Sequence, residues 1–271
     1  MNKTELKDLL QLAINASLKG GEEIIKVYND TIEVEYKNDR SPLTQADKRA
    51  HNAIVEILSQ TEIHILSEEG KHLDFEERKN WEYLWIVDPL DGTKEFIKRN
   101  GEFTVNIALV KNSEVIMGVI YVPVLKTLYF GLEGFGSYRV KDNLQDAKYS
   151  LKMLEENGQR LPIKLERPFT MVGSRSHMSE ETKSYFDGYK KQYPDLEIIS
   201  KGSSLKICMV AEGTADIYPR FAPTMEWDTA AGHGIAKEAG FEIYKTEEEM
   251  PLEYNKSDLL NPWFIVKPKV S

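Results

Sequence analysis

Two aspartates, a glycine and a threonine lie within six positions directly after the apolar run Leu84–Val87. The run reads as a buried strand that a proline and a glycine bring to an end, which places Asp88 and Asp91 at a strand end. Their carboxylates and the carbonyl oxygen of Leu90 can converge on one hard cation, and Mg²⁺ prefers oxygen ligands of this kind. Open sheets also tend to bind ligands at strand ends. Taken alone, the segment is better interpreted as an Asx-type turn that closes a strand.

Further carboxylates occupy the predicted ends of other elements. Glu68 and Glu69 follow the apolar run Ile63–Leu66, Asp47 lies in the first turn of a predicted helix, and Asp228 begins another. Each has a structural alternative: a solvated turn for the glutamates, an N-terminal cap for Asp47 and a favourable helix-dipole interaction for Asp228. Carboxylates gathered in one site repel strongly without cations. A functional role for the whole set therefore requires metal.

The segment Gly202–Lys206 opens a further predicted helix, where free backbone N–H groups can hold a phosphate. The formal net charge of the chain is −9, so an anionic substrate can bind only where metal ions or a few local Lys and Arg side chains reverse the field. The same charge argues against a nucleic-acid polymer as a partner. We therefore expect a small anionic molecule as the ligand.

With 271 residues, the chain suits one large domain or two small ones. Its single cysteine, Cys208, has apolar neighbours in a predicted helix, which favours a buried, inert thiol and a reducing compartment. We find no apolar segment long enough to span a bilayer and no secretory signal at the start. These features predict a cytoplasmic protein. Peripheral attachment to the inner face of the cell membrane stays open, because it needs no anchor.

The apolar pattern predicts an α+β half over residues 1–144. Residues 4–28 and 44–58 read as helices that flank an antiparallel sheet of short, closely spaced strands. A separate strand is expected at 32–36, between the two helices. The strands of the sheet are expected at Ile63–Leu66, Leu84–Val87, Val105–Val110, Val115–Val122 and Leu128–Phe130.

A different pattern over residues 145–271 predicts an α/β half, with the polar loop Lys141–Lys148 as the boundary. Here strands alternate with helices near 179–192, 203–213 and 228–239. The strands are expected at Phe169–Val172, Leu196–Ile199, Ile217–Tyr218, Phe241–Tyr244 and Phe264–Val266.

Three motifs follow one another along nearly the whole chain: Glu-Glu, Asp-Pro-x-Asp-Gly-Thr and Trp-Asp. Their order resembles that of the magnesium-dependent, lithium-sensitive phosphatases of the inositol monophosphatase family. Longer segments are similar to the CysQ branch of that family, the 3'(2'),5'-bisphosphate nucleotidases. The resemblance implies a layered αβαβα sandwich of the sugar phosphatase type. The similar segments are Asp91–Ile107, Gly173–His177, Gly202–Cys208, Ala215–Arg220 and Met225–Gly232.

By this resemblance, Glu68, Asp88 and the carbonyl of Leu90 would hold a first Mg²⁺. Asp88, Asp91 and Asp228 would hold a second, and a third ion would join with substrate. Two-metal sites of this kind activate a water molecule and stabilise the leaving oxygen in phosphate hydrolysis. The metal set also implies that Glu68 is a catalytic residue.

The pair Asp47 and Thr93 resembles the family's dyad that orients and deprotonates the attacking water. Five residues of the second half match positions that contact the nucleotide and its retained 5'-phosphate: Ser174, His177, Ser203, Lys206 and Arg220. The alternative for His177 is a loop histidine with satisfied hydrogen bonds, and for Arg220 a surface cation. The full set of implied substrate contacts is Glu68, Leu90, Asp91, Gly92, Thr93, Ser174, His177, Ser203, Lys206, Arg220 and Asp228.

These residues predict an Mg²⁺-dependent phosphatase that hydrolyses adenosine 3',5'-bisphosphate (PAP) to AMP and phosphate. 3'-Phosphoadenosine 5'-phosphosulfate (PAPS) is a second candidate substrate. An inositol or other sugar phosphate phosphatase is the alternative within the family, since it need not carry the set Ser203, Lys206 and Arg220. A non-catalytic nucleotide-sensing protein is the alternative from another class. An aspartyl-phosphate phosphatase is disfavoured because two residues, rather than one, separate Asp88 and Asp91.

Overall fold

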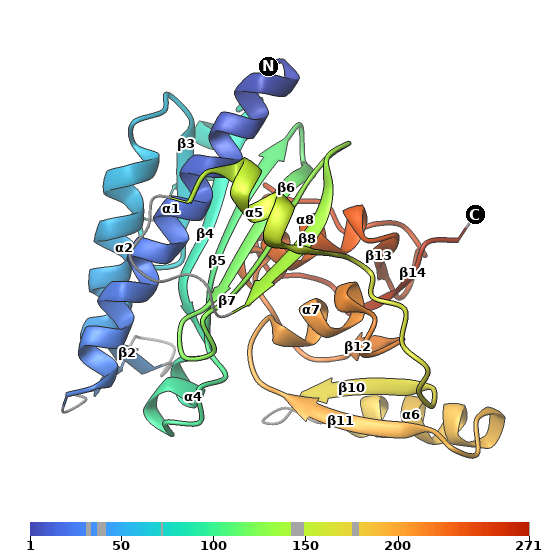
Figure 1. Ribbon diagram of the computed structural model, residues 1–271. Coiled ribbons are helices and arrows are strands. Elements are labelled where there is room, and N and C mark those ends of the chain that lie inside the picture. The colour runs from blue at the N-terminus through green and yellow to red at the C-terminus, as the bar shows by residue number, and fades with distance from the viewer. Residues whose placement is uncertain (31–33, 37–41, 72, 142–148, 175–178, 271) are drawn as a thin grey trace.

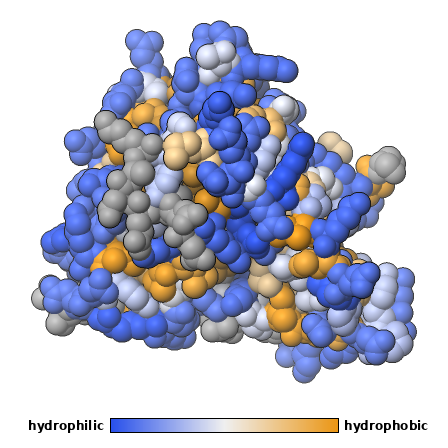
Figure 2. Space-filling model, viewed as in Figure 1, coloured by the Kyte–Doolittle hydropathy of each residue, from blue (hydrophilic) through white to orange (hydrophobic). Residues whose placement is uncertain are grey.

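Layers of helix and sheet alternate through the computed structural model, which describes residues 1–30, 34–36, 42–71, 73–141, 149–174 and 179–270 (Figure 1). Two long helices, a large sheet, a second pair of helices, a smaller group of strands and an outer helix follow one another. This order agrees with the αβαβα sandwich that the sequence predicts. The face in Figure 2 is mostly hydrophilic, with scattered apolar patches. None of the described helices is long and apolar enough to cross a membrane.

The first helical layer consists of α1 (Lys3–Tyr28) and α2 (Gln45–Leu58), which pack together on one face of the large sheet. Each helix begins with a capping box, from Asn2 and Thr44 respectively. In this motif the cap residue and a carboxylate three residues later satisfy N–H groups that have no partner within the helix. Between the two helices, β1 (Val34–Tyr36) pairs antiparallel with β2 (Pro42–Thr44).

The large sheet has seven strands in the order β3-β4-β5-β6-β7-β8-β9. The predicted antiparallel pairing is wrong at one edge, where β3 runs parallel to β4. The chain between these two strands includes α3 (Phe75–Arg78) and is long enough for the crossover that parallel strands require. The strands are β3 (His64–Ser67), β4 (Tyr83–Asp91), β5 (Thr104–Lys111), β6 (Glu114–Val122), β7 (Thr127–Leu132), β8 (Gly136–Lys141) and β9 (Gln159–Arg160).

Both faces of this sheet are buried, which explains the continuous apolar run in β4. Trp85 and Val87 belong to the core beneath α1 and α2, whereas Leu84 and Ile86 belong to the core on the opposite face. Successive side chains of a strand point to opposite faces, so a strand covered on both sides needs apolar residues at every position. The run delivers Asp88 and Asp91 to the end of a rigid, fully covered strand.

The opposite face is covered by α7 (Leu205–Glu212) and α8 (Glu226–Glu238), and a smaller group of strands lies beyond them. Helices alternate with strands here as predicted, and β10 and β11 pair in parallel, but β14 lies antiparallel between β12 and β13. No helix separates β13 from β14, so the chain returns without a crossover. The strands are β10 (Thr170–Ser174), β11 (Glu197–Lys201), β12 (Tyr218–Arg220), β13 (Phe241–Lys245) and β14 (Phe264–Pro268).

The outer helix, α6 (Glu180–Gln192), packs against these strands through Phe186, which contacts Met171 and Ile217. The predicted boundary between residues 144 and 145 falls outside the described residues, so the division into two domains stays a prediction. Two elements beyond that boundary join the first half: α5 (Leu151–Asn157) contacts α1, and β9 pairs with β8.

Glycines bring α8 into backbone contact with the large sheet. A Cβ atom added at Gly118 of β6 would lie 2.0 Å from the carbonyl oxygen of Ala231, and one added at Gly234 would lie 2.7 Å from the backbone nitrogen of Gly118. These distances are shorter than atoms can approach, so only glycine permits this depth of packing. Because α8 also carries Asp228 in its first turn, the contact fixes how far that carboxylate reaches toward β4.

We expect Gly118→Ala to reduce the free energy of unfolding by about 1–3 kcal/mol or more, because overpacking forces the helix away from the sheet. Gly188→Ala is the matched control, since Gly188 lies in α6 with open space around its Cα. Its effect should be neutral or stabilising by up to about 1 kcal/mol. Urea unfolding curves measure both. Equal effects of the two substitutions would contradict close packing at Gly118.

Candidate active site

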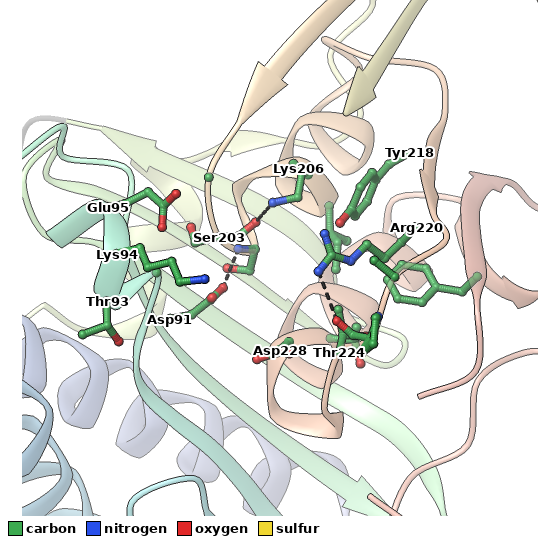
Figure 3. A pocket seen from close by; sticks show the side chains of 18 of the residues that line it. Asp91, Thr93, Lys94, Glu95, Ser203, Lys206, Tyr218, Arg220, Thr224 and Asp228 are labelled. Carbon is green, nitrogen blue, oxygen red and sulfur yellow. Dashed lines mark hydrogen bonds between the residues drawn. The ribbon is translucent and has the colours of Figure 1, made fainter. Parts of the chain in front are cut away.

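A cavity of about 440 Å³ opens between the end of β4, the short helix α4 (Thr93–Ile97) and the first turns of α7 and α8 (Figure 3). It draws its walls from both halves of the chain, and most of the predicted site residues line it. Asp88 lies deeper, with 1% of its surface exposed. The polar lining residues are Glu68, Asp91, Thr93, Lys94, Glu95, Ser203, Ser204, Lys206, Tyr218, Arg220, Thr224, Asp228 and Thr229.

Three predicted metal ligands meet at one end of this cavity. Asp88, Asp91 and Asp228 each offer a carboxylate oxygen, and these oxygens lie within 4.8 Å of one another. Glu68 is close enough for its charge to raise the pKa of Asp88, and its backbone N–H donates to the carbonyl of Val87 at 3.1 Å. The tertiary structure thus gathers side chains from the β3–β4 connection, from β4 and from α8.

Burial makes this cluster costly to ionise. It is the main cause that raises the pKa of Asp91 to about 6 and that of Asp228 to about 8, and neighbouring carboxylates raise both further. The pKa of Asp88 lies well above its ordinary value for the same reasons. The positive charge of Lys206 acts in the opposite direction on Asp91. A divalent cation would remove the mutual repulsion, and the all-oxygen donor set suits Mg²⁺. These residues therefore fit the predicted metal.

Asp47 has two functions in the structure, one for each carboxylate oxygen. Oδ2 accepts hydrogen bonds from the backbone N–H and the hydroxyl of Thr44, both at 2.7 Å, which caps α2. Oδ1 accepts from the hydroxyl of Thr93 at 3.3 Å. The helix cap and the pairing with Thr93 are thus both present, and the same 2%-exposed side chain serves both.

Gly92, whose backbone conformation is left-handed, turns the chain from β4 into α4. Gly92 has φ +92°, and a Cβ atom there would lie 3.1 Å from the carbonyl oxygen of Glu102 and 3.2 Å from Cβ of Ser203. Both the dihedral angle and the crowding favour glycine. The turn places Thr93 at the cavity wall, with its hydroxyl 3.4 Å from the carbonyl oxygen of Leu90. The backbone N–H of Leu90 in turn donates to Asp88 at 3.0 Å.

The wall formed by α7 and β12 is cationic. Lys206 donates from Nζ to the carbonyl of Ser203 at 2.5 Å, and burial lowers its pKa to about 8. Arg220 donates to the carbonyl of Pro223 at 3.1 Å, and Figure 3 shows its guanidinium group and the amine of Lys206 on the same side of the cavity. Two buried atoms here, Nε of Arg220 and Oγ of Ser203, have no hydrogen-bond partner among the described residues.

The structure describes the other two predicted nucleotide contacts, Ser174 and His177, only in part. Ser174 ends β10, where its backbone pairs with that of Lys201 just before the Gly202–Lys206 segment. His177 lies outside the described residues. Its predicted role therefore stays a prediction.

Several residues at the site were not singled out from the sequence. They are Thr104 and Asn106 of β5 and the lining residues Lys94, Glu95, Ser204, Tyr218, Thr224 and Thr229. Asn106 and the backbone N–H of Ser204 both donate to Oδ2 of Asp91. A signal was present, because Thr104 and Asn106 are polar residues two positions apart in the otherwise apolar β5. Residues at that spacing share one face of a strand, so the pattern indicates a buried polar contact on that face.

The start of α8 is held by the segment that precedes β14. Met225 donates its backbone N–H to Asp228 at 2.7 Å, and its carbonyl accepts from Asn261 at 2.8 Å. Glu226, which is fully buried, accepts from Nζ of Lys256 at 2.6 Å. These bonds fix the orientation of Asp228 from the side opposite to the sheet.

The raised pKa of Asp228 predicts a pH-dependent stability. The folded value of about 8 lies above the ordinary value of 3.8, so the native state keeps a proton that the unfolded chain releases. The stability of the metal-free protein should therefore fall as pH rises from about 4 to about 8, and Mg²⁺ should restore it. In Asp228→Asn, we expect a higher melting temperature than wild type at pH 8 without metal and a reduced response to Mg²⁺.

Thermal melting at several pH values, with a chelator or with Mg²⁺, measures this effect. Asp8→Asn is the control, since Asp8 is exposed on α1. A metal-free Asp228→Asn variant whose melting temperature follows wild type across the pH range would contradict the buried acidic cluster.

The chain is similar to known proteins over nearly its whole length. Residues 5–268 match the model of the inositol monophosphatase family. The 3'(2'),5'-bisphosphate nucleotidase CysQ of Salmonella typhimurium is 44% identical, covering 96% of this chain and 98% of the relative. CysQ of Escherichia coli K12 is 43% identical with the same coverage.

A solved structure agrees with these matches. The crystal structure of CysQ from Bacteroides thetaiotaomicron, described as a bacterial member of the inositol monophosphatase family, is 55% identical. It covers 99% of this chain and 100% of its own, with a TM-score of 0.92. On the family model, the curated relatives and the solved fold together, this chain belongs to the inositol monophosphatase family.

Proposed function

We propose that this protein is an Mg²⁺-dependent, lithium-sensitive 3'(2'),5'-bisphosphate nucleotidase that hydrolyses PAP to AMP and phosphate. The observation that carries the proposal is one cavity with two kinds of phosphate-binding wall. An acidic cluster suited to metal ions forms one wall, and Lys206 and Arg220 lie on another (Figure 3). A substrate with two phosphates matches this division, because each phosphate then meets its own positive charge. The names of the curated relatives support the same substrate.

Metal dependence is a general property of this family, and the acidic cluster fits it. We assign Glu68, Asp88, the carbonyl of Leu90, Asp91 and Asp228 as the groups that hold two to three Mg²⁺ ions. When bound, these ions supply Lewis-acid activation of water and neutralise charge on the phosphate. The carboxylates themselves fix the positions at which that chemistry takes place.

Thr93 and Asp47 handle the proton of the attacking water. The Thr93 hydroxyl already donates to Oδ1 of Asp47 at 3.3 Å, so its oxygen is oriented to accept a hydrogen bond from a water molecule in the cavity. A threonine hydroxyl alone is a poor base, and the proton can pass through it to the carboxylate. Burial raises the pKa of Asp47, which makes it a better proton acceptor than an exposed aspartate.

The two phosphates would occupy different ends of the cavity. The N–H groups of Gly92 and Thr93 are assigned to the 3'-phosphate, beside the acidic cluster. Ser203, Lys206 and Arg220 are assigned to the retained 5'-phosphate. The buried Oγ of Ser203 and Nε of Arg220 support this assignment, because a phosphate oxygen would satisfy both.

A phosphatase for inositol phosphates or other sugar phosphates is the second candidate. It would use the same acidic cluster and the pair Asp47 and Thr93, but it gives no reason for the two cations Lys206 and Arg220 on the other wall of the cavity. A nucleotide-sensing protein without activity explains the cations and leaves the acidic cluster unexplained. PAPS, whose 3'-phosphate has the same surroundings as that of PAP, is proposed as a further substrate. The predicted cytoplasmic location of the protein stays a prediction.

The substrate proposal predicts that phosphate is released from PAP in the presence of Mg²⁺ and that lithium inhibits this release. Release from inositol 1-phosphate under the same conditions should be much slower. A colorimetric phosphate assay with purified protein measures both reactions. Preference for inositol 1-phosphate would overturn the nucleotide assignment, and no release from either substrate would favour the sensing protein.

Arg220→Ala tests the second phosphate. We expect kcat/KM for PAP to fall about 10- to 100-fold, because a charge-assisted hydrogen bond is worth about 1.5–3 kcal/mol. Adenosine 3'-phosphate lacks the 5'-phosphate, so its kcat/KM should change less than about threefold by the same argument. Arg160→Ala, an exposed arginine on β9, controls for the loss of one positive charge. Equal losses of kcat/KM on both nucleotides would contradict the assignment of Arg220 to the 5'-phosphate.

A further inference from the structure

Three polar side chains, here called the ring, lie within hydrogen-bond distance of one another and join β5 to the start of α7. Their two hydroxyl protons make two of the three contacts hydrogen bonds at any one time. The hydroxyl oxygens of Thr104 and Ser204 lie 2.8 Å apart, and each lies 2.9 Å from Oδ1 of Asn106. All three side chains are buried. Buried polar side chains linked in this way restrict one another, because turning one of them out of the ring leaves a buried group without a partner.

The carboxylate of Asp91 decides which way the amide of Asn106 points. An ionised carboxylate can only accept, so Nδ2 faces it and donates to Oδ2 at 3.4 Å. Oδ1 then faces the two hydroxyls of the ring, which can donate to it. If the amide were reversed, an oxygen would face the carboxylate and a repulsive contact would replace a hydrogen bond.

Asp91 receives a second hydrogen bond from the same region. The backbone N–H of Ser204 donates to Oδ2 at 2.6 Å, so this oxygen has one donor from β5 and one from the start of α7. The other oxygen of Asp91 is then the one available to a cation shared with Asp88 and Asp228. The two donors set the rotation of the carboxylate.

The ring also fixes the segment that faces the second phosphate. Ser204 follows directly on Ser203, whose φ of +46° is unusual for a residue other than glycine. Lys206, one turn further, donates to the carbonyl of Ser203. A displaced Ser204 would move both neighbours together with the donor to Asp91.

We propose that Asn106 is a positioning residue, supported by Thr104 and Ser204, that sets Asp91 for metal binding and couples it to the segment that binds the second phosphate. This inference rests on the proposed metal role of Asp91. Loss of the ring should weaken binding of Mg²⁺ and of the nucleotide together. Side chains that orient a metal ligand typically contribute 10- to 100-fold in metal affinity.

Two variants test the ring, and both are measured without turnover. Asn106→Leu keeps a similar size and removes both polar atoms, and Thr104→Val removes one hydroxyl at constant shape. The Mg²⁺ concentration that gives half of the thermal stabilisation should rise about tenfold in Asn106→Leu and about threefold in Thr104→Val. Thr104→Ser, which restores the hydroxyl, should return to within about twofold of wild type. Thr127→Val is the matched control, a buried threonine of β7 outside the cavity.

Calorimetric binding of AMP at saturating Mg²⁺ provides the second measurement. AMP carries only the retained phosphate, and its Kd should rise in Asn106→Leu and Thr104→Val but not in Thr127→Val. In the double variant Asn106→Leu/Ser204→Ala, the change in the Mg²⁺ midpoint should be smaller than the product of the two single changes, because one ring is broken only once.

The outcomes separate this inference from the proposed function. If wild type shows no Mg²⁺-dependent stabilisation, the proposed metal site fails and the inference fails with it. If wild type responds and both variants respond at the same Mg²⁺ concentration as Thr127→Val, only the positioning role is overturned. If Asn106→Leu does not fold, Thr104→Val and its Thr104→Ser rescue decide the question.

Discussion

Mutual repulsion among buried carboxylates is the constraint on which the rest of the site depends. Asp88, Asp91 and Asp228 hold oxygens within 4.8 Å of one another in a place where burial already disfavours charge. Such a cluster persists only if a rigid framework opposes its separation and a bound proton or a cation relieves its charge. The doubly covered strand β4 holds two of the three aspartates. Backbone contact at Gly118 and the bonds from the segment before β14 hold the helix that carries the third.

The cavity joins this acidic cluster to groups of opposite charge. Lys206 lowers the pKa of Asp91, and Asp91 in turn helps the buried amine to stay protonated. Metal site and phosphate site are therefore electrostatically linked before any ligand binds. The hydrogen bond from Ser204 to Asp91 adds a mechanical link. A substrate with two phosphates would engage both parts at once, so β4 with its two aspartates and the segment with Lys206 and Arg220 would act on the same molecule.

Much of the fold could be predicted from periodicity, because long helices and buried strands have strong patterns. The helix over residues 4–28 and the run in β4 agree closely with α1 and with the buried centre of the strand. The parallel pairing of β3 was not predictable, since a short apolar run has the same pattern in either direction. The strand β8 and the helix α5 were missed because their apolar residues are few and mixed with polar ones. Asp47 shows what the resemblance adds: its position alone indicates a helix cap, the resemblance predicts its pairing with Thr93, and the structure contains both contacts.

The sequence by itself determined the family and the chemical types at the site, because the motif around Asp88 and Asp91 carries both in a few adjacent residues. It also identified Lys206 and Arg220 as candidates through their resemblance to known nucleotide contacts. Only the tertiary structure decided that these residues share one cavity, since they come from separate strands and helices that meet through packing. It alone revealed the ring of Thr104, Asn106 and Ser204. Such a ring joins residues almost a hundred positions apart, and hydrogen bonds at that separation leave no local pattern in the chain.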